Sequence, residues 1–419
     1  MNTTKIKVFK FGGASVKNPA GVRNVASIIQ SCHPEKLLVV ISAMGKTTDG
    51  LEKLVEYSRN RKNFNSELQV LKDYHQNIIT DLFKDPKAVR IAVGKIFDQL
   101  THDLARDGEY DMVYDQVVSC GEVLSTIIVQ HFLVEQGIAS QWVDARQYIS
   151  TDDTFREGKV DWQKTSKQIE SLRDVLDEKV IITQGFIGLT PDGFTTTLGR
   201  EGSDFSAAIF ASCLNAESLT IWKDVPGVMN ADPKRLAVAT VFEELPFREA
   251  AEMTYYGASV IHPKTIKPLA NKNIPLLVKN FANPLLPGTR IHECQIDKLP
   301  PLIVFKDNQC LISCKVTDYT FISEEQLSFI FKALSELDIR INVLQNSAIT
   351  FSFCIDYRES KVTKLIQRLQ KSFEVYYNLG LTLVTIKNYD EETFDMYRKK
   401  PGVILEQSSR STLQILLKP

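Results

Sequence analysis

A lysine and a pair of glycines stand where the first apolar segment gives way to a helical pattern. The segment reads Lys10-Phe11-Gly12-Gly13-Ala14-Ser15-Val16. Paired glycines let backbone N–H groups approach a phosphate, and the positive end of a helix attracts the same anion. A lysine just before them can reach the terminal phosphoryl oxygens as a mobile charge. The pattern predicts a phosphate-binding turn, and the alternative is an ordinary glycine turn beside a surface lysine.

A small hydroxyl-bearing turn follows the next apolar run. The segment SAMGKTT at 42–48 superficially resembles a Walker phosphate loop. That motif requires a glycine five residues before Gly45, where this chain has Val40, so a Walker loop is excluded. The turn remains suited to contacts with an anion or a hydroxyl group, and a helix cap is the alternative.

The most informative segment is TTTLGREGSD at 195–204, in which threonines lead into a glycine-rich turn before a helix. Arg200 offers a planar fork that matches a carboxylate. Asp204 lies near the start of the helix, where an acid often only caps the backbone. Its functional alternative is to hold a catalytic lysine in position.

Two further segments carry polar groups at the ends of predicted elements. Ser119-Cys120-Gly121-Glu122 opens a helix. Its acid either complements the helix dipole or pairs with a substrate ammonium group. The loop WKDVPGVMNADP at 222–233 follows a strand and either clasps a nucleoside or is a plain connection.

The sequence lacks the motifs of several other kinds of chemistry. There is no G-x-G-x-x-G fingerprint, so no built-in nicotinamide-binding domain is expected. The six histidines lack metal-ligand spacing, and no protein metal site is expected. Cys310 and Cys314 fall on one face of a strand, which favours a place in the core.

The elements that must position these residues alternate between strand and helix over the first 290 residues or so. Alternation of this kind predicts an α/β sandwich with a mostly parallel central sheet, whose ligands lie at the carboxyl ends of the strands. The expected strands are 5–11, 37–43, 140–144, 179–187, 219–224 and 274–278, and the expected helices include 20–31, 64–83, 88–106, 122–136, 163–176 and 203–213.

A proline-rich stretch at 283–301 marks a domain boundary. Beyond it the pattern suggests a repeated small α+β unit, the second copy lacking room for a closing helix and strand. The first copy comprises strands 309–315, 340–345, 348–355 and 374–377 with helices 323–337 and 360–372. The second copy comprises strands 381–387, 402–407 and 411–417 with helix 391–398.

Composition narrows the class of protein. The 419 residues suit two or three domains, and 50 basic against 51 acidic residues give no field that would attract nucleic acid. The start lacks a secretory signal, and no apolar run reaches the roughly 18 residues of a membrane span. Seven cysteines, an odd number, fit reduced thiols. We expect a cytoplasmic enzyme that binds neither membrane nor nucleic acid.

Taken together and in order, the segments KFGGAS, SAMGKTTD, SCGEVLST, WVDAR, TQGF, TTTLGREGSD, WKDVPGV and MTYYGASVIHP resemble the aspartokinases of the amino acid kinase superfamily. The resemblance implies an amino acid kinase-type three-layer sandwich over 1–295. It also implies two ACT-type, ferredoxin-like regulatory modules, at 300–380 and, truncated, at 381–419. A homodimer formed through the ACT-type region and an amino-acid effector are implied as well.

The resemblance further implies that ATP, with Mg²⁺, phosphorylates the side-chain carboxylate of L-aspartate to 4-phospho-L-aspartate, the first step toward lysine, threonine and methionine. Glu122 would face the aspartate ammonium, Arg200 its α-carboxylate, and Asp204 would orient Lys10. The implied catalytic residues are Lys10 and Asp204; those for aspartate are Thr47, Glu122, Arg200 and Ser203; those for ATP are Lys10, Phe11, Gly12, Gly13, Lys223, Asp224, Met229, Lys234, Ser259 and Val260.

Several positions depart from the family pattern. Ala14 replaces a threonine, Glu201 a glycine, and Ser259 a lysine for which Lys264 is a substitute. Met229 stands where an aromatic residue is frequent. Glu201 adds negative charge to the turn that would bind aspartate, so we expect its side chain to point toward a lysine or solvent.

The carboxyl-terminal half departs further. Where lysine-sensing relatives carry acids, this chain has Asn342 and Ala348, which predicts weak or absent inhibition by lysine. A plain dimerisation module is the alternative.

Two other functions remain open from the sequence. One is another amino acid kinase, acting on glutamate, N-acetylglutamate or a nucleotide; Glu122 and Arg200 favour aspartate instead. The other is a catalytically impaired, ACT-containing regulatory subunit. The retained Lys10 and Asp204 oppose that possibility, whereas Ala14, Glu201 and Ser259 keep it open.

Overall fold

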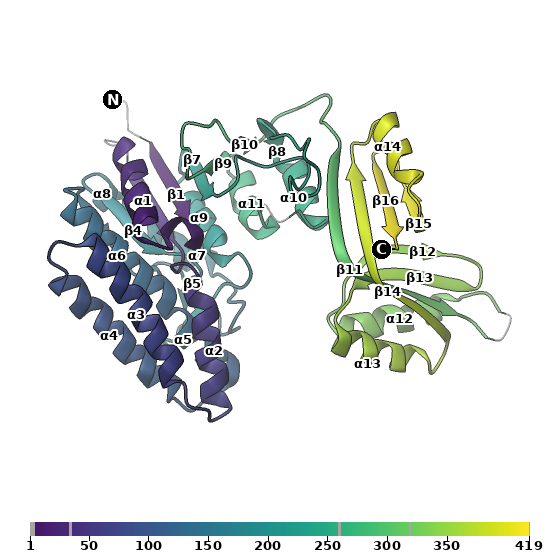
Figure 1. Ribbon diagram of the computed structural model, residues 1–419, viewed down its shortest axis with the longest axis horizontal. Helices are drawn as coiled ribbons and strands as arrows, with labels where there is room; N and C mark the ends of the chain where they lie inside the picture. Colours follow the sequence, from purple (N-terminus) through teal and green to yellow (C-terminus); the bar gives the residue numbers. More distant parts are fainter. Residues whose placement is uncertain (1–4, 33–35, 259–260, 318–319, 419) are drawn as a thin grey trace. The chain divides into compact units, whose positions relative to one another are not determined.

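The computed structural model describes residues 5–32, 36–258, 261–317 and 320–418. The chain forms two compact units, which are drawn in Figure 1. The first comprises Met1–Val228, Val241–Ala251 and Ser259–Gln295, and the second comprises Met229–Thr240, Glu252–Ala258 and Ile296–Pro419.

An eight-stranded sheet forms the centre of the first unit, in the order β3-β4-β2-β1-β7-β9-β10-β8. The strands are β1 (Ile6–Phe11), β2 (Lys36–Ile41), β3 (Ser140–Trp142), β4 (Val180–Gln184), β7 (Ser218–Lys223), β8 (Glu244–Pro246), β9 (Leu276–Asn280) and β10 (Thr289–His292). All neighbours pair in parallel except β9 and β10. The predicted, mostly parallel sheet is thereby confirmed. A small hairpin of β5 (Ile187–Leu189) and β6 (Thr195–Thr197) stands apart from it.

Helices cover both faces of this sheet, because alternate side chains of each strand point to opposite sides. The face with Phe9, Val39 and Ile182 packs against the group α1–α6, and the other face packs against α9 (Figure 1). The helices are α1 (Pro19–Ser31), α2 (Thr47–Arg59), α3 (Asn65–Leu82), α4 (Lys87–Leu104), α5 (Tyr110–Val118), α6 (Cys120–Glu135), α7 (Trp162–Glu170), α8 (Arg173–Leu176), α9 (Gly202–Cys213), α10 (Phe247–Tyr255) and α11 (Pro263–Ala270). Helices α2, α5, α10 and α11 are not among the helices named from the sequence, and the helix expected at 163–176 is divided into α7 and α8.

One helical stretch among the described residues, Tyr110–Glu135, is long and apolar enough to cross a membrane. Of its most apolar window, 78% is buried inside the protein. A helix that is apolar on all sides and enclosed in this way is a core helix.

The second unit contains a six-stranded antiparallel sheet in the order β12-β13-β11-β14-β16-β15. Helices α12 and α13 pack on one half of the sheet, over a core that includes Cys310 and Cys314, as predicted. Helix α14 packs on the other half through Tyr397. The elements are β11 (Leu302–Lys315), α12 (Glu324–Glu336), β12 (Ile341–Asn346), β13 (Thr350–Asp356), α13 (Glu359–Leu369), β14 (Glu374–Lys387), α14 (Glu391–Arg398), β15 (Val403–Ser408) and β16 (Thr412–Leu417).

The strands predicted at 374–377 and 381–387 are one strand, β14, because both pair along the same long partner, β11. The register shifts between Lys306 and Gln309 of β11, and Gly380 has a φ of +69° beside this irregularity. The first half of β11, 302–306, pairs with the second half of β14 beside β16. The second small module therefore takes a strand from the segment that precedes the first module, which the sequence pattern did not reveal.

Candidate active site

The carboxyl ends of β1, β2, β4 and β7 meet at one edge of the parallel sheet. In register, Phe11 pairs with Ile41 on one side and with Trp222 on the other, and Ile41 pairs with Gln184. The turns predicted to carry chemistry follow these strand ends. Ligands of open α/β sheets bind at this edge.

The predicted contact between Lys10 and Asp204 is present. The Lys10 Nζ lies 2.6 Å from the Asp204 Oδ1, and the Lys223 Nζ lies 3.6 Å from the other carboxylate oxygen. Lys10 is 8% and Asp204 3% exposed. Burial alone would raise the pKa of Asp204, but the ammonium groups of Lys10 and Lys223 hold it below its ordinary value. Asp204 is therefore an anchored anion between two lysines, at the first turn of α9.

The glycine turn is held directly against the turn that follows β2. A Cβ on Gly13 would lie 2.5 Å from the Ala43 carbonyl oxygen, so only glycine fits there. The Gly45 N–H donates to the Gly13 carbonyl at 3.1 Å, with Gly45 at a φ of +56°. The chain after Gly12 forms a short 3₁₀ turn, Gly13–Val16, and α1 begins only at Pro19.

Thr47 and Glu122 are brought together by the packing of α2 against α6. The Cβ position of Gly121 lies 3.3 Å from the Thr47 Cγ2. Glu122 is 3% exposed and accepts a 3.4 Å hydrogen bond from the Ala43 N–H. Its other oxygen, Oε2, is buried without a hydrogen-bond partner among the described residues. Burial raises the pKa of Glu122 to about 8, against the lowering effects of the Ala43 N–H and Lys10. An orphaned carboxylate of this kind can receive a cationic group from a ligand.

The turn that carries Arg200 and Ser203 is tied down by a residue not identified from the sequence, Asp115 of α5. This buried carboxylate accepts from the Thr197 N–H and hydroxyl, both at 2.8 Å. An acid inside the apolar stretch VYDQVV was the available signal. Ser203 packs so closely on Gly185 that a Cβ there would lie 2.5 Å from the Ser203 Cβ. The Arg200 side chain is exposed and makes no ion pair with any part of the chain that the structure describes.

The expectation for Glu201 is wrong for one of its carboxylate oxygens. Oε2 is buried, and no described residue hydrogen-bonds to it, so it faces neither a lysine nor solvent. Glu201 has a φ of +55° and immediately precedes α9. Its charge therefore lies close to the positive end of α9, which offsets part of the free-energy cost of burying that oxygen without a hydrogen bond.

The residues assigned to ATP are brought together only in part. Lys10, Gly12, Gly13, Lys223 and Asp224 lie at the sheet edge. The ring of Phe11 is stacked on Trp222 in the core, with centroids 5.8 Å apart, so only its backbone faces the turn. Met229 and Lys234 belong to the second unit, and Ser259 and Val260 lie outside the described residues.

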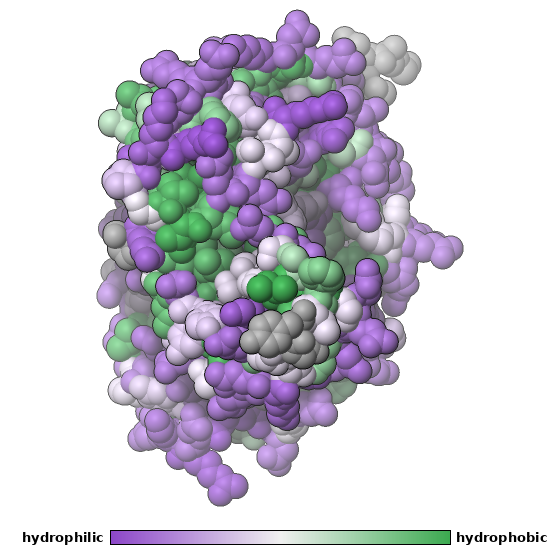
Figure 2. Space-filling view, turned by 90° about the vertical axis from the view of Figure 1, so that its right-hand side faces the viewer, coloured by the Kyte–Doolittle hydropathy of each residue, from purple (hydrophilic) through white to green (hydrophobic). Residues whose placement is uncertain are grey.

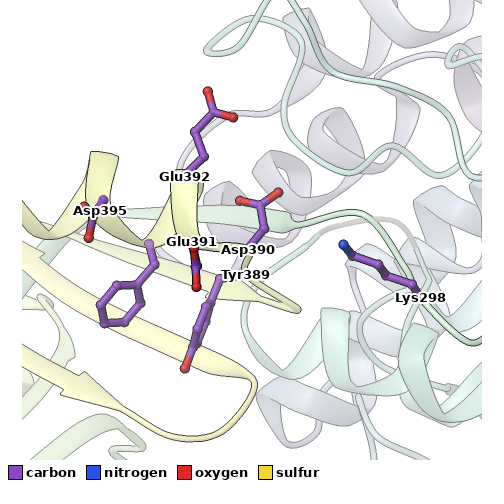
Figure 3. Close-up of a pocket in the computed structure, with 7 residues that line it drawn as sticks. Lys298, Tyr389, Asp390, Glu391, Glu392 and Asp395 are labelled. Carbon is purple, nitrogen blue, oxygen red and sulfur yellow. The ribbon is translucent and has the colours of Figure 1, made fainter.

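Within the described ranges, no group of three or more His, Cys, Asp or Glu side chains could hold a metal ion. The pocket in Figure 3, in the second unit, is rich in acids, and one of them, Asp390, caps α14 by accepting from the Thr393 N–H. Hydrogen bonds from Thr393, with Lys298 nearby, lower the pKa of Asp390. None of the predicted site residues lines this pocket.

Comparison with known proteins agrees with this arrangement. The model of the amino acid kinase family matches residues 5–280. Lysine-sensitive aspartokinase 3 of Escherichia coli is 31% identical over 400 residues, covering 92% of this chain and 88% of that protein. Chloroplastic aspartokinase 1 of Arabidopsis thaliana is 33% identical over 86% of this chain and 65% of its own length. The chain spans only 42% of a bifunctional aspartokinase/homoserine dehydrogenase of Arabidopsis, at 30% identity.

Solved structures agree as well. E. coli aspartokinase III in complex with lysine and aspartate superposes with a TM-score of 0.83 at 28% identity, over 98% of this chain and 96% of that one. The same enzyme with aspartate and ADP gives 0.81, over 99% and 96%. The chain therefore belongs to the amino acid kinase family and, within it, to the aspartokinases.

Proposed function

We propose that residues 1–295 form a catalytic domain that transfers the γ-phosphoryl group of ATP to the side-chain carboxylate of L-aspartate, giving 4-phospho-L-aspartate. The product would enter the synthesis of lysine, threonine and methionine in the cytoplasm. The observation that carries the proposal is the cluster of buried Lys10 and Asp204 with half-buried Lys223, beside the glycine turn. Two ammonium groups on an anchored carboxylate form a site for a polyphosphate.

The proposed reaction requires the protein mainly to position the reactants and to neutralise charge on the phosphoryl group. The attacking aspartate carboxylate is already ionised at neutral pH, so no general base is needed. Lys10 and Lys223 would neutralise charge on the phosphoryl oxygens, and Asp204 would keep Lys10 in place between turnovers. Such positioning and charge stabilisation account for most phosphoryl-transfer catalysis.

The few carboxylates near the glycine turn also suit a magnesium ion that is bound mainly by ATP. The only buried carboxylate in the lysine cluster, Asp204, is already paired. Mg²⁺ commonly keeps water and binds substrate phosphates rather than an all-protein cage. When bound, it would neutralise phosphate charge alongside the lysines, with exposed Asp224 at the end of β7 within the same turn.

Aspartate would be held by Glu122 at its ammonium group and by Arg200 at its α-carboxylate, with Thr47 and Ser203 alongside. The unpartnered Glu122 Oε2 supports this assignment, since a ligand ammonium would supply the missing partner. Exposed Arg200 has no competing ion pair among the described residues, so its fork can close on a carboxylate.

The test is to trap the acyl phosphate with hydroxylamine in the presence of ATP, Mg²⁺ and L-aspartate. Glutamate and the variants Lys10→Ala and Lys17→Ala run in parallel; Lys17 is an exposed lysine near the same turn. We expect aspartyl hydroxamate from the wild type and from Lys17→Ala, and none from Lys10→Ala. No hydroxamate from folded, ATP-binding protein would contradict the proposal and favour a regulatory subunit, and glutamyl hydroxamate would favour a different amino acid kinase.

The second unit would be a pair of ACT-type modules that joins two chains. Strands β12 and β15 end the six-stranded sheet and offer unpaired edges, which can pair with another copy across a two-fold axis. Exposed Leu344 of β12 and Leu379 of β14 add apolar surface. Figure 2 shows hydrophobic side chains gathered in a patch on the face it draws, among polar ones. Light scattering should give twice the mass of one chain.

Inhibition by lysine through these modules would be weak or absent. The Asn342 amide group donates to Gln309 at 2.7 Å and to Asp356 at 2.9 Å, and its oxygen accepts from the Lys306 Nζ at 2.9 Å. Its hydrogen bonds are therefore committed to its own chain, and an ammonium group already occupies its acceptor. A dose–response curve with half-inhibition at sub-millimolar lysine would contradict this proposal.

A further inference from the structure

A polar cavity of about 650 Å³ lies in the first unit and is lined by residues of α4, α5, α6 and the β5–β6 hairpin. In the part of the chain that the structure describes, no residue proposed to bind aspartate or ATP lines it. Its volume falls within the range of small-molecule sites, and several of its polar side chains are buried. The cavity is therefore a candidate binding site of its own, separate from the lysine cluster at the sheet edge.

One wall of this cavity carries a buried acid, Asp103, in the last turn of α4. Asp103 is 6% exposed, and each of its carboxylate oxygens lies 3.1 Å from the Gln99 amide nitrogen. Among the described residues, the one basic side chain within 4 Å is that of exposed His102, whose Nδ1 lies at 3.7 Å. A buried carboxylate without a buried cation carries a free-energy cost that a positively charged ligand would offset.

Two arginines line the same cavity, and neither pairs with the buried acid. The Arg106 guanidinium lies over the Phe194 ring, 5.6 Å from its centroid, and makes no ion pair with any residue in the described ranges. Arg146 is held by Asp144, with the Nη2 2.6 Å from the Oδ2, and its Nη1 lies 3.4 Å from the Thr195 hydroxyl oxygen. Arg106 therefore keeps its fork of N–H donors available for a carboxylate.

The Cys120 thiol, in the first turn of α6, shows that charges of both signs act on one part of the cavity. Burial raises the pKa of Cys120 to about 12, and the Asp103 carboxylate raises it further, whereas the Arg146 guanidinium lowers it. The acid and this arginine are thus both near one sulfur atom, although no ion pair joins them. Space between them remains for a ligand.

This arrangement matches a ligand that carries both signs of charge. The ammonium group of an α-amino acid can donate to Asp103, and its carboxylate matches the guanidinium of Arg106. A ligand with only negative charge would face Asp103 without compensation, and a ligand with only positive charge would face Arg106. The apolar side chains of Ile96, Val123 and Leu189 complete the lining and suit an aliphatic side chain.

We infer that this cavity binds a free aliphatic α-amino acid, with Asp103 at the ammonium group of the ligand and Arg106 at its carboxylate. The Arg106 N–H donates to the Asp103 carbonyl oxygen at 3.2 Å, so the two side chains leave one short turn at the end of α4. They can therefore reach the two charged groups on one α-carbon. This second amino-acid site goes beyond the proposed reaction at the sheet edge.

The test is calorimetric titration of the full chain with L-leucine, L-isoleucine and L-valine. Saturating ADP and L-aspartate are present throughout, so that the proposed catalytic site is already filled. Two analogues of leucine separate its charged groups: 4-methylpentanoate lacks the ammonium group, and 3-methylbutylamine lacks the carboxylate. We expect L-leucine to bind and each analogue to bind at least about tenfold more weakly, the effect of losing one charged hydrogen-bonding group.

Substitutions locate the binding on the chain. Asp103→Asn keeps the size of the side chain and removes its charge, and Arg106→Met keeps an unbranched stem without the guanidinium. We expect each to weaken the binding of L-leucine by at least about tenfold. Asp98→Asn and Arg90→Met are the matched controls, because both alter exposed residues of α4 that do not line the cavity. They should leave the binding unchanged.

Three results would overturn the inference. The first is no heat of binding from any of the three amino acids at millimolar concentration. The second is equal binding of L-leucine and either analogue, a comparison that needs only the unaltered protein. The third is binding that persists in both Asp103→Asn and Arg106→Met, which would locate the ligand elsewhere on the chain. Failure of the hydroxamate assay would instead refute the proposed reaction and leave these titrations unaffected, so the two failures are distinguishable.

Discussion

Two buried carboxylates in the first unit differ in their partners. Asp204 and Glu122 are both 3% exposed. Asp204 lies between the ammonium groups of Lys10 and Lys223, whereas the Glu122 Oε2 has no partner among the described residues. Their pKa values accordingly move apart, Asp204 downward and Glu122 to about 8. The difference supports the proposal that the Asp204 carboxylate stabilises the folded protein, whereas the Glu122 carboxyl group awaits a cationic ligand.

Removing the paired carboxylate should have the largest effect. Asp204→Ala removes the carboxylate that Lys10 and Lys223 share, and breaking a buried pair in this way costs about 3–5 kcal/mol. We expect the free energy of unfolding to fall by about that amount in urea titrations. The kcat should fall by roughly 100-fold, because Lys10 loses its anchor. Unchanged stability would mean that the pair is not formed in solution.

Removing the unpaired carboxylate should separate stability from function. Glu122→Gln replaces a buried carboxyl group that has no counter-ion among the described residues, so the free energy of unfolding near pH 7 should stay constant or rise by about 1 kcal/mol. The KM for L-aspartate should rise by roughly 30-fold, since the ligand ammonium loses its anionic partner. Thermal unfolding and steady-state kinetics on the same preparation test both statements. A loss of stability as large as in Asp204→Ala would erase the distinction between the two acids.

The contrast between these two carboxyl groups also predicts that the free energy of unfolding depends on pH. The folded pKa of Glu122, about 8, lies above its ordinary value of 4.5, so between these values the folded protein holds more protons than the unfolded chain. Its contribution to stability therefore declines as pH rises from about 4.5 to about 8, by on the order of 2–4 kcal/mol, and is constant outside that window. Denaturant titrations from pH 5 to pH 8 should show this decline in the wild type and not in Glu122→Gln.

Binding of aspartate should lower the pKa of Glu122 toward its ordinary value. An ammonium group beside Glu122 favours the ionised form, so the carboxyl group should release a proton when the ligand binds near pH 7. Calorimetry in buffers of different ionisation enthalpy should detect up to one proton released per site in the wild type. Glu122→Gln is the control, and an equal release from that variant would assign the proton to another group.

The smallest effect concerns a third carboxylate, that of Glu201. Its Oε2 is buried without a partner among the described residues, and its φ of +55° is a conformation that glycine adopts without strain. Glu201→Gly should therefore raise the free energy of unfolding by about 1 kcal/mol, measured by urea denaturation. The KM for L-aspartate should fall about two- to threefold, because a negative charge leaves the turn. A higher KM would show that Glu201 assists binding.

Much of this molecule followed from local sequence pattern. Apolar runs alternating with helical periodicity predicted the parallel sheet, because burial on both faces requires continuous apolar strands. The glycine pair after Lys10 and the turn at 195–204 indicated a phosphate and carboxylate site, because these residue types suit those ligands in any fold. Cys310 and Cys314 were placed in the core by alternation along one strand.

Only the tertiary structure decided which of these segments meet. Lys10 and Asp204 are far apart along the chain and touch because β1 and α9 pack together. Asp115 sat inside an ordinary helical pattern, and only packing aimed its carboxylate at Thr197. The segment 302–306 completes the second small module by pairing with β14. Periodicity reports which face of an element is buried, whereas strand order and helix packing, which depend on contacts distant in sequence, decide what that face meets.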